Sequence, residues 1–98
     1  MKTIMPAEVK DRLAQGQKLN IIDVREDEEV AAGMIPGAVH IPMGQIPERL
    51  SEIEPTDEII LVCRSGGRSS RVYEYLEGRG YTGLLNMTGG MLEWEKRD

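Results

Sequence analysis

Two short apolar runs restrict most strongly what this chain of 98 residues can fold into. Residues Leu19–Arg25 have the sequence LNIIDVR, and residues Glu58–Cys63 have the sequence EIILVC. Both runs are rich in β-branched residues, and their centres are too continuously apolar for strands with one face in water. The two runs therefore predict buried strands of a parallel sheet.

Helical signals alternate with the predicted strands. Pro6–Gln15 begins with a proline, which suits the first turn of a helix, and Gly16 follows it. The acidic run Glu26–Glu29 suits the positive end of a helix dipole, and Gly33 can end the short helix expected there. The remaining pattern predicts a turn and further elements: strands at Ala38–Ile41 and Gly83–Met87, a turn at Glu54–Asp57, and helices at Met43–Ile53, Ser69–Glu77 and Met91–Lys96.

This order of elements predicts an α/β fold. Strands that alternate with helices imply right-handed crossovers and a parallel sheet covered on both faces. The length suits a single domain, residues 1–98. Ligands of open parallel sheets bind beyond the carboxyl ends of the strands, and Cys63 stands at such an end.

Composition argues against several classes of protein. A net charge of −5 argues against a protein that binds the phosphate backbone of nucleic acids. No stretch approaches the roughly 18 apolar residues of a membrane-spanning helix, and residues 1–10 lack the apolar block of a signal peptide, so we expect a cytoplasmic protein with no membrane role. One cysteine and one histidine can form neither an intrachain disulfide nor a structural zinc site. Without an internal resolving thiol, Cys63 must pass whatever it carries to an outside acceptor.

The segment CRSGGRSS, residues 63–70, joins the second buried strand to a helix. Its glycines, Gly66 and Gly67, permit a curled backbone whose amides form an anion-binding nest beside a helix N-terminus. Lowering a cysteine pKa of about 8.5 by one unit needs about 1.4 kcal/mol, and a helix dipole typically supplies about 0.3–1 kcal/mol. The loop amides, Arg64 and Arg68 must supply the rest. The pattern indicates a reactive Cys63 thiolate and a small anionic substrate, in preference to an inert buried cysteine.

The loop resembles the active-site loop of rhodanese-domain sulfurtransferases of the single-domain bacterial type. The likeness covers nearly the whole chain, in the family's order: Asp23-Val24-Arg25-Glu26, Gly33 with Ile35-Pro36-Gly37-Ala38, His40-Ile41-Pro42, residues 63–70, Gly80-Tyr81, and Gly89-Gly90-Met91 with Trp94. This resemblance implies a rhodanese-like fold, a central five-stranded parallel sheet with helices on both faces and a short strand near Thr3. The chain departs from the family at Met34, where many relatives have histidine, and at Val30, which replaces a frequent aromatic residue; we expect both changes to affect packing more than chemistry.

The resemblance also implies a mechanism without a cofactor or metal. Cys63 would be the catalytic nucleophile, in a substrate-binding loop made of Arg64, Ser65, Gly66, Gly67, Arg68 and Ser69. Its thiolate would take the outer sulfur of thiosulfate or of a low-molecular-weight persulfide and become a persulfide. The acceptor would be cyanide or a thiol, protein thiols included. We expect Arg64 to steer the donor anion and Arg68 to shape the loop.

Two other functions compete with sulfur transfer. Cysteine phosphatases of the cell-cycle activating type share this fold, but they place five residues between cysteine and arginine, whereas Cys63 and Arg68 enclose four. A non-catalytic sulfur-carrier or interaction module is the second alternative, although inactive relatives usually lose the cysteine that this chain retains. We expect a structural hydrogen bond from His40 and a supporting ion pair between Asp23 and Arg25. The physiological donor and acceptor, the pathway and the oligomeric state do not follow from the sequence.

Overall fold

The computed structural model describes residues 1–55 and 58–96, so part of the turn predicted at 54–57 lies outside the described residues. Five parallel strands form one sheet in the order β1-β5-β4-β2-β3. The predicted parallel α/β fold is confirmed, including the short first strand implied by the resemblance. The strands are β1 Thr3–Ile4, β2 Ile21–Asp23, β3 Val39–His40, β4 Ile59–Val62 and β5 Leu84–Met87.

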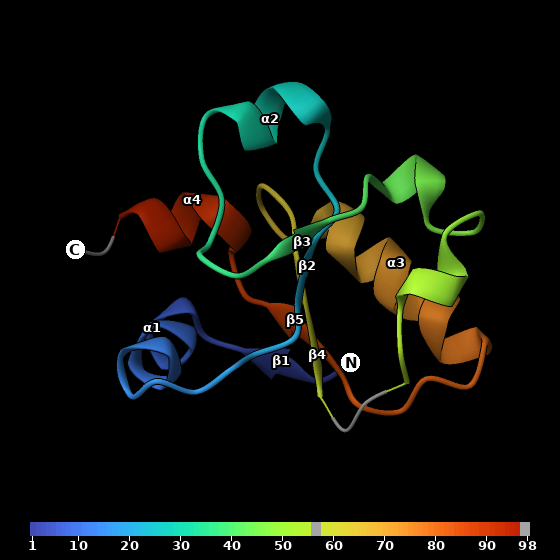
Figure 1. The fold of residues 1–98 in the computed structure, drawn as a ribbon, viewed down its shortest axis with the longest axis horizontal. Coiled ribbons are helices and arrows are strands. Elements are labelled where there is room, and N and C mark those ends of the chain that lie inside the picture. Colours follow the sequence, from blue (N-terminus) through green and yellow to red (C-terminus); the bar gives the residue numbers. More distant parts are fainter. Residues whose placement is uncertain (56–57, 97–98) are drawn as a thin grey trace.

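Helices cover both faces of this sheet (Figure 1). Helices α1 (Pro6–Ala14) and α4 (Gly90–Glu95) pack together on one face, and α3 (Gly67–Gly78) packs against β4 and β5 on the other. The short helix α2 (Asp27–Ala31) follows β2. None of the helices in the described residues is long and apolar enough to cross a membrane.

Alternation of side chains along the buried strands divides the core into two layers. Ile60 of β4 packs on the side of α1 and α4, and its neighbour Leu61 packs on the side of α3. Both side chains are fully buried, so β4 has no solvent-facing side. This two-sided burial explains why the strand is a continuous apolar run in the sequence.

The helix predicted at Met43–Ile53 is wrong. The structure has two short 3₁₀ helices there, η1 (Met43–Gln45) and η2 (Leu50–Glu52), with a turn between them. Pro47 stands in the middle of the segment and has no N–H group to donate to the Met43 carbonyl, while Gly44 adds a conformational cost. The apolar residues of the segment do face the core, since Ile46 and Ile53 are buried, but they lie on separate short turns and not on one helix.

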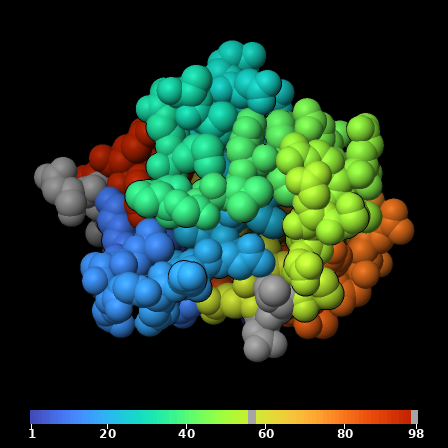
Figure 2. Space-filling model, viewed as in Figure 1, coloured from blue at the N-terminus to red at the C-terminus, as the bar shows by residue number. Residues whose placement is uncertain are grey.

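The direction of the strand connections reverses between β2 and β4. From β2 the chain passes to β3 at one edge, whereas from β4 it passes through α3 to β5 in the opposite direction. Such a reversal is the place where open parallel sheets hold their ligands. Figure 2 shows that the segments from α2 through η2, coloured cyan to yellow-green, form much of the face of the molecule that is in view.

Candidate functional site

Cys63 lies directly after β4, where the strand connections reverse between β2 and β4. The residue is 1% exposed, but its sulfur faces backbone donors and not only apolar neighbours. The Gly66 amide donates a hydrogen bond to Cys63 Sγ at 2.9 Å, and Ser69 Oγ lies 3.3 Å from the same sulfur. Gly66 has a φ of +107°, which a residue with a side chain rarely adopts, so glycine at this position allows the loop to curl around the sulfur.

The loop lowers the pKa of the Cys63 thiol. Burial raises this pKa and is the largest single influence on it. The hydrogen bonds act in the opposite direction and outweigh burial: they come from the Ser69 side chain and from the backbone amides of Ser69, Gly66 and Ser65. Donors that converge on the sulfur therefore favour the thiolate, which is the nucleophilic form of cysteine.

Helix α4 fixes the orientation of the loop peptides. The Met91 amide donates to the Cys63 carbonyl at 2.9 Å, and the Leu92 amide donates to the Arg64 carbonyl at 3.0 Å. These amides are among the donors that a helix leaves free at its N-terminus. Gly90 makes the approach possible, because a Cβ there would stand 2.4 Å from the Cys63 carbonyl oxygen and 2.6 Å from the Arg64 carbonyl carbon. With the Arg64 carbonyl held by α4, the Ser65 amide that follows it faces the sulfur.

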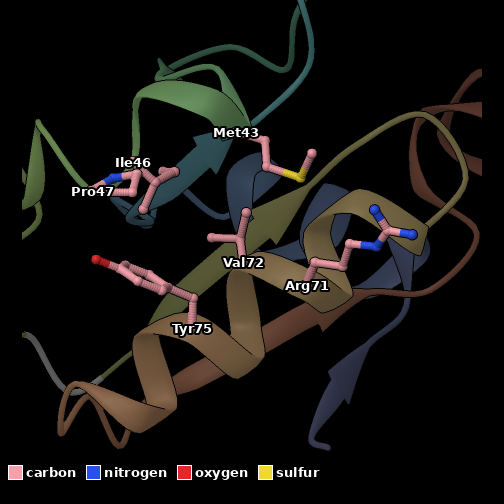
Figure 3. Close-up of a pocket in the computed structure, with 6 residues that line it drawn as sticks. All are labelled: Met43, Ile46, Pro47, Arg71, Val72 and Tyr75. Atoms are coloured by element: carbon pink, nitrogen blue, oxygen red, sulfur yellow. The ribbon is translucent and has the colours of Figure 1, made fainter.

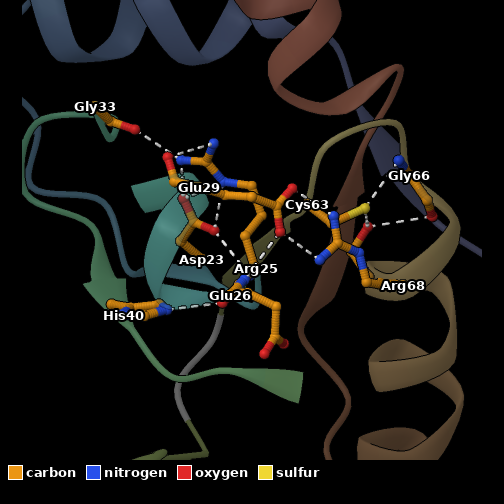
Figure 4. Close-up of polar contacts among 10 residues, drawn as sticks. Asp23, Arg25, Glu26, Glu29, Gly33, His40, Cys63, Gly66 and Arg68 are labelled. Carbon is orange, nitrogen blue, oxygen red and sulfur yellow. Dashed lines mark hydrogen bonds and ion pairs between the residues drawn. The ribbon is translucent and has the colours of Figure 1, made fainter. Parts of the chain in front are cut away.

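Arg68 is held by a carboxylate. Its guanidinium makes a bidentate ion pair with Glu29 of α2, with N–O distances of 2.6 and 2.8 Å (Figure 4). This hydrogen bonding from Arg68 lowers the pKa of Glu29 to about 2. The pair ties the start of α3 to the segment after β2. Arg64, in contrast, is exposed at the mouth of the loop.

A second arginine, Arg25, holds the segment that follows β2. Arg25 is buried with Asp23, and its guanidinium nitrogens contact both carboxylate oxygens at 2.8–3.0 Å. Arg25 also donates to the Gly33 carbonyl at 2.8 Å, so it closes the loop that contains α2. His40 Nε2 lies 2.7 Å from the Arg25 carbonyl oxygen, which is the structural hydrogen bond expected from the sequence (Figure 4).

The predicted site residues come together around one loop, but they differ in exposure. Ser69 is buried, Gly66 and Arg68 are half-buried, and Arg64, Ser65 and Gly67 are exposed. Among the described residues, no group of three histidine, cysteine, aspartate or glutamate side chains could hold a metal ion.

Sequence reasoning missed two residues of this neighbourhood, Glu29 and Asn86. Asn86 of β5 is buried and lies 2.5 Å from Ser69 Oγ through its side-chain oxygen. Asn86 left a signal, because it is a polar residue inside the otherwise apolar strand LLNM. Glu29 left none specific to its role, because the helix-dipole argument explains an acidic residue there equally well.

A mostly apolar pocket of about 190 Å³ lies between η1 and α3 (Figure 3). Met43, Ile46 and Pro47 line it from the η1 side, and Arg71, Val72 and Tyr75 line it from α3. Val72 packs in the same core layer as Cys63. The pocket therefore adjoins the layer that supports the loop.

Comparison with known proteins finds relatives that match nearly the whole chain. YtwF of Bacillus subtilis is 47% identical over 95 residues, which cover 97% of this chain and 91% of YtwF. A sulfurtransferase of Allochromatium vinosum is 40% identical over 88 residues, which cover 90% of this chain and 82% of that protein. The crystal structure of a rhodanese-like domain protein from Staphylococcus aureus is 42% identical and superimposes with a TM-score of 0.89 over 96% of this chain and 91% of that one.

The family model of the rhodanese-like domain matches residues 5–97. This range includes β2 to β5, α1 to α4 and the complete loop around Cys63. The sequence match and the fold agree on one assignment: the chain belongs to the rhodanese-like domain family.

Proposed function

We propose that this protein is a sulfurtransferase that moves sulfane sulfur from a small anionic donor to a thiophilic acceptor through a Cys63 persulfide. The observation that carries the proposal is the ring of donors around Cys63 Sγ, in which the Gly66 amide stands 2.9 Å from the sulfur. Family membership and the sulfurtransferase from Allochromatium vinosum support the reaction class. The low exposure of Cys63 favours a donor whose terminal sulfur is small and enters first.

In the first step the Cys63 thiolate attacks the outer sulfur of thiosulfate or of a low-molecular-weight persulfide. A bond forms between Sγ and that sulfur, and the donor's S–S bond breaks with its electron pair on sulfite or on the leaving thiolate. The hydrogen bonds of the loop lower the pKa of the Cys63 thiol and so make the attacking thiolate easier to form. The exposed Arg64 guanidinium would attract the donor anion to the mouth of the loop.

In the second step a thiolate or cyanide attacks the outer sulfur of the persulfide. The Sγ–S bond breaks, and Cys63 leaves as a thiolate that accepts hydrogen bonds again from the Gly66 amide and the Ser69 hydroxyl. The donors that favour the nucleophile therefore also favour the leaving group. Arg68 would act on loop shape, because Glu29 holds both ends of its guanidinium.

Intact mass after incubation with thiosulfate tests this proposal, because Cys63 is the single cysteine. We expect the wild-type protein to gain the mass of one sulfur atom and to lose it when cyanide is added. Cys63→Ser should gain nothing, and its matched control, Ser65→Ala in the same loop, should still be loaded. Turnover of a phosphate ester without any loading by sulfur would overturn the proposal in favour of the phosphatase alternative.

A further inference from the structure

A buried polar cluster lies behind the Cys63 sulfur, and Asn86 is its centre. Asn86 is 5% exposed and is the register partner of Leu61 in β4, so its side chain enters the layer that contains α3 and Cys63. It contacts Ser69 Oγ at 2.5 Å, Ser70 Oγ at 2.9 Å and the Gly66 carbonyl oxygen at 3.3 Å. One side chain of β5 thus touches three residues at the beginning of α3.

These contacts determine which way the Asn86 amide points. A carbonyl oxygen can only accept a hydrogen bond, so the Asn86 atom that faces the Gly66 carbonyl is the amide nitrogen. The amide oxygen Oδ1 must then face Ser69. Because Oδ1 also can only accept, the hydroxyl proton of Ser69 occupies the short contact between them.

The Ser69 hydroxyl has only one proton, yet three acceptors lie within its reach: Cys63 Sγ at 3.3 Å, the Gly66 carbonyl oxygen at 3.2 Å and Asn86 Oδ1 at 2.5 Å. When Cys63 is a thiol, its S–H can donate to Ser69 Oγ at 3.3 Å while Ser69 donates to Asn86 Oδ1. When Cys63 is a thiolate, the sulfur has no proton to give and requires one from Ser69. The Gly66 carbonyl needs no donation from Ser69, because Ser70 already donates to it through its hydroxyl at 2.7 Å and its amide at 3.1 Å.

We propose that Asn86 is a positioning residue that holds the Ser69 hydroxyl proton whenever the Cys63 sulfur does not need it. The hydroxyl donates to Asn86 Oδ1 while Cys63 is a thiol, and it rotates to donate to Sγ once the thiol proton has left to solvent. For the persulfide the inference rests on the proposed function: Sγ is then a neutral bridging sulfur, and the hydroxyl returns to Asn86. Asn86 thereby limits how far Ser69 stabilises the thiolate.

Asn86 and Ser69 are uncharged, so both can be substituted in a test while the charged groups near Cys63 stay the same. Arg68 of α3 acts on the sulfur by its charge and is itself paired with Glu29 of α2. Arg64 adjoins Cys63 in the chain and is exposed. Helix α4 and β5 approach the loop through backbone amides and through Asn86. Substitutions at positions 86 and 69 leave all of these charges in place.

A double-mutant cycle tests the proposal without a sulfur donor, so failure of sulfur transfer would not affect it. The thiolate absorbs near 240 nm, and subtraction of the Cys63→Ser spectrum removes the tyrosine contribution at each pH. In Asn86→Leu, whose side chain has a similar size and no acceptor, the Ser69 proton is free for the sulfur. We expect the pKa of Cys63 to fall by about 0.5 unit or more, because a hydrogen bond to the charged form favours that form.

The second half of the cycle uses Ser69→Ala, in which the pKa of Cys63 should rise. Asn86→Leu added to Ser69→Ala should change it by less than about 0.2 unit, because Asn86 then has no hydroxyl to act through. Asn86→Asp should raise it above the wild-type value, because a carboxylate retains the Ser69 proton and adds a negative charge. If Asn86→Leu does not fold, Asn86→Ala removes the same oxygen. An unchanged or raised pKa in Asn86→Leu, or an equal shift with and without Ser69, would overturn the proposal.

Discussion

At the scale of single residues, the site depends on the side chains that contact the Cys63 loop from other elements. The sequence predicts a nucleophile and its loop from residues 63–70 alone, because these residues are contiguous and their chemistry is local. The contacts that its partners make with the loop could not be predicted from the sequence, although Asn86 is conspicuous as a polar residue in an apolar strand. Glu29 and Asn86 meet it only because β2, β4 and β5 lie side by side in the sheet. Tertiary contacts of this kind leave no periodic signal in one sequence.

The ion pair between Glu29 and Arg68 predicts a pH-dependent stability. The pKa of Glu29 is lowered from 4.5 to about 2, so the pair contributes fully above pH 4.5 and its contribution is lost as the pH falls toward 2. Glu29→Gln should therefore cost about 1 kcal/mol of unfolding free energy at pH 7 and much less near pH 2, measured by urea unfolding. Glu77→Gln, at an exposed position of α3, is the control. An equal cost at both pH values would contradict this prediction.

The buried pair of Asp23 and Arg25 predicts a larger effect. Asp23 is 1% exposed, and without its carboxylate the Arg25 guanidinium would be a buried charge without its counter-ion. Asp23→Ala should lower the free energy of unfolding by about 3–5 kcal/mol, measured by urea denaturation. The double variant Asp23→Ala with Arg25→Met removes the stranded charge and should recover part of that loss. A double variant less stable than Asp23→Ala would show that Arg25 contributes chiefly through other contacts.

At the scale of elements, prediction succeeded where a helix or strand buries a regular face and failed where proline interrupts one. Strand β4 was evident because both of its faces are buried, which leaves no polar position in its centre. The segment 43–53 has apolar spacing compatible with a helix, but Pro47 divides it into η1 and η2. Strand β1, only two residues long, gave no signal from propensity and was expected only from the family resemblance.

The contact of α4 with the loop makes Gly90 a position that tolerates no side chain. Its φ is +57°, and a Cβ would overlap the backbone of Cys63 and Arg64. Gly90→Ala should destabilise the protein by about 4 kcal/mol or more and should raise the pKa of Cys63, because the loop must move. Thermal unfolding and the absorbance of the thiolate measure the two effects.

Gly37→Ala is the matched control for Gly90→Ala. Gly37 also has a positive φ, +84°, but nothing lies within 4 Å of a Cβ built there. This variant should show only backbone strain, about 1–2 kcal/mol, with an unchanged pKa of Cys63. Similar losses of stability in the two variants would mean that the overlap of a Cβ at position 90 with the loop costs no stability beyond backbone strain.

At the scale of the whole molecule, both core layers share the same strands, so we expect the two layers to unfold together. Ile60 belongs to the layer of α1 and α4, and Leu61, next to it, belongs to the layer of α3. The pairing of β1 with β5 joins residues near the two ends of the chain. These connections support the prediction that residues 1–98 form a single domain.

A comparison of two spectroscopic probes tests that prediction. Trp94, the single tryptophan, packs against the layer of α1 and α4, whereas far-UV circular dichroism reports all helices, α3 included. Urea unfolding followed by Trp94 fluorescence and by circular dichroism should give the same midpoint, as expected for two-state unfolding. An earlier midpoint for Trp94 would show that α4 and its layer detach before the rest.

The hydrogen bonds from α4 to the carbonyls of Cys63 and Arg64 also determine at which stage of folding the thiol acquires its lowered pKa. The thiol is encoded at position 63, but its activating surroundings are complete only after residues 90–92 have docked. Partly folded molecules in which α4 has not docked therefore lack the full set of contacts that lowers the pKa of the Cys63 thiol. The lowered pKa of the thiol is therefore a property of the completed fold and not of the loop sequence alone.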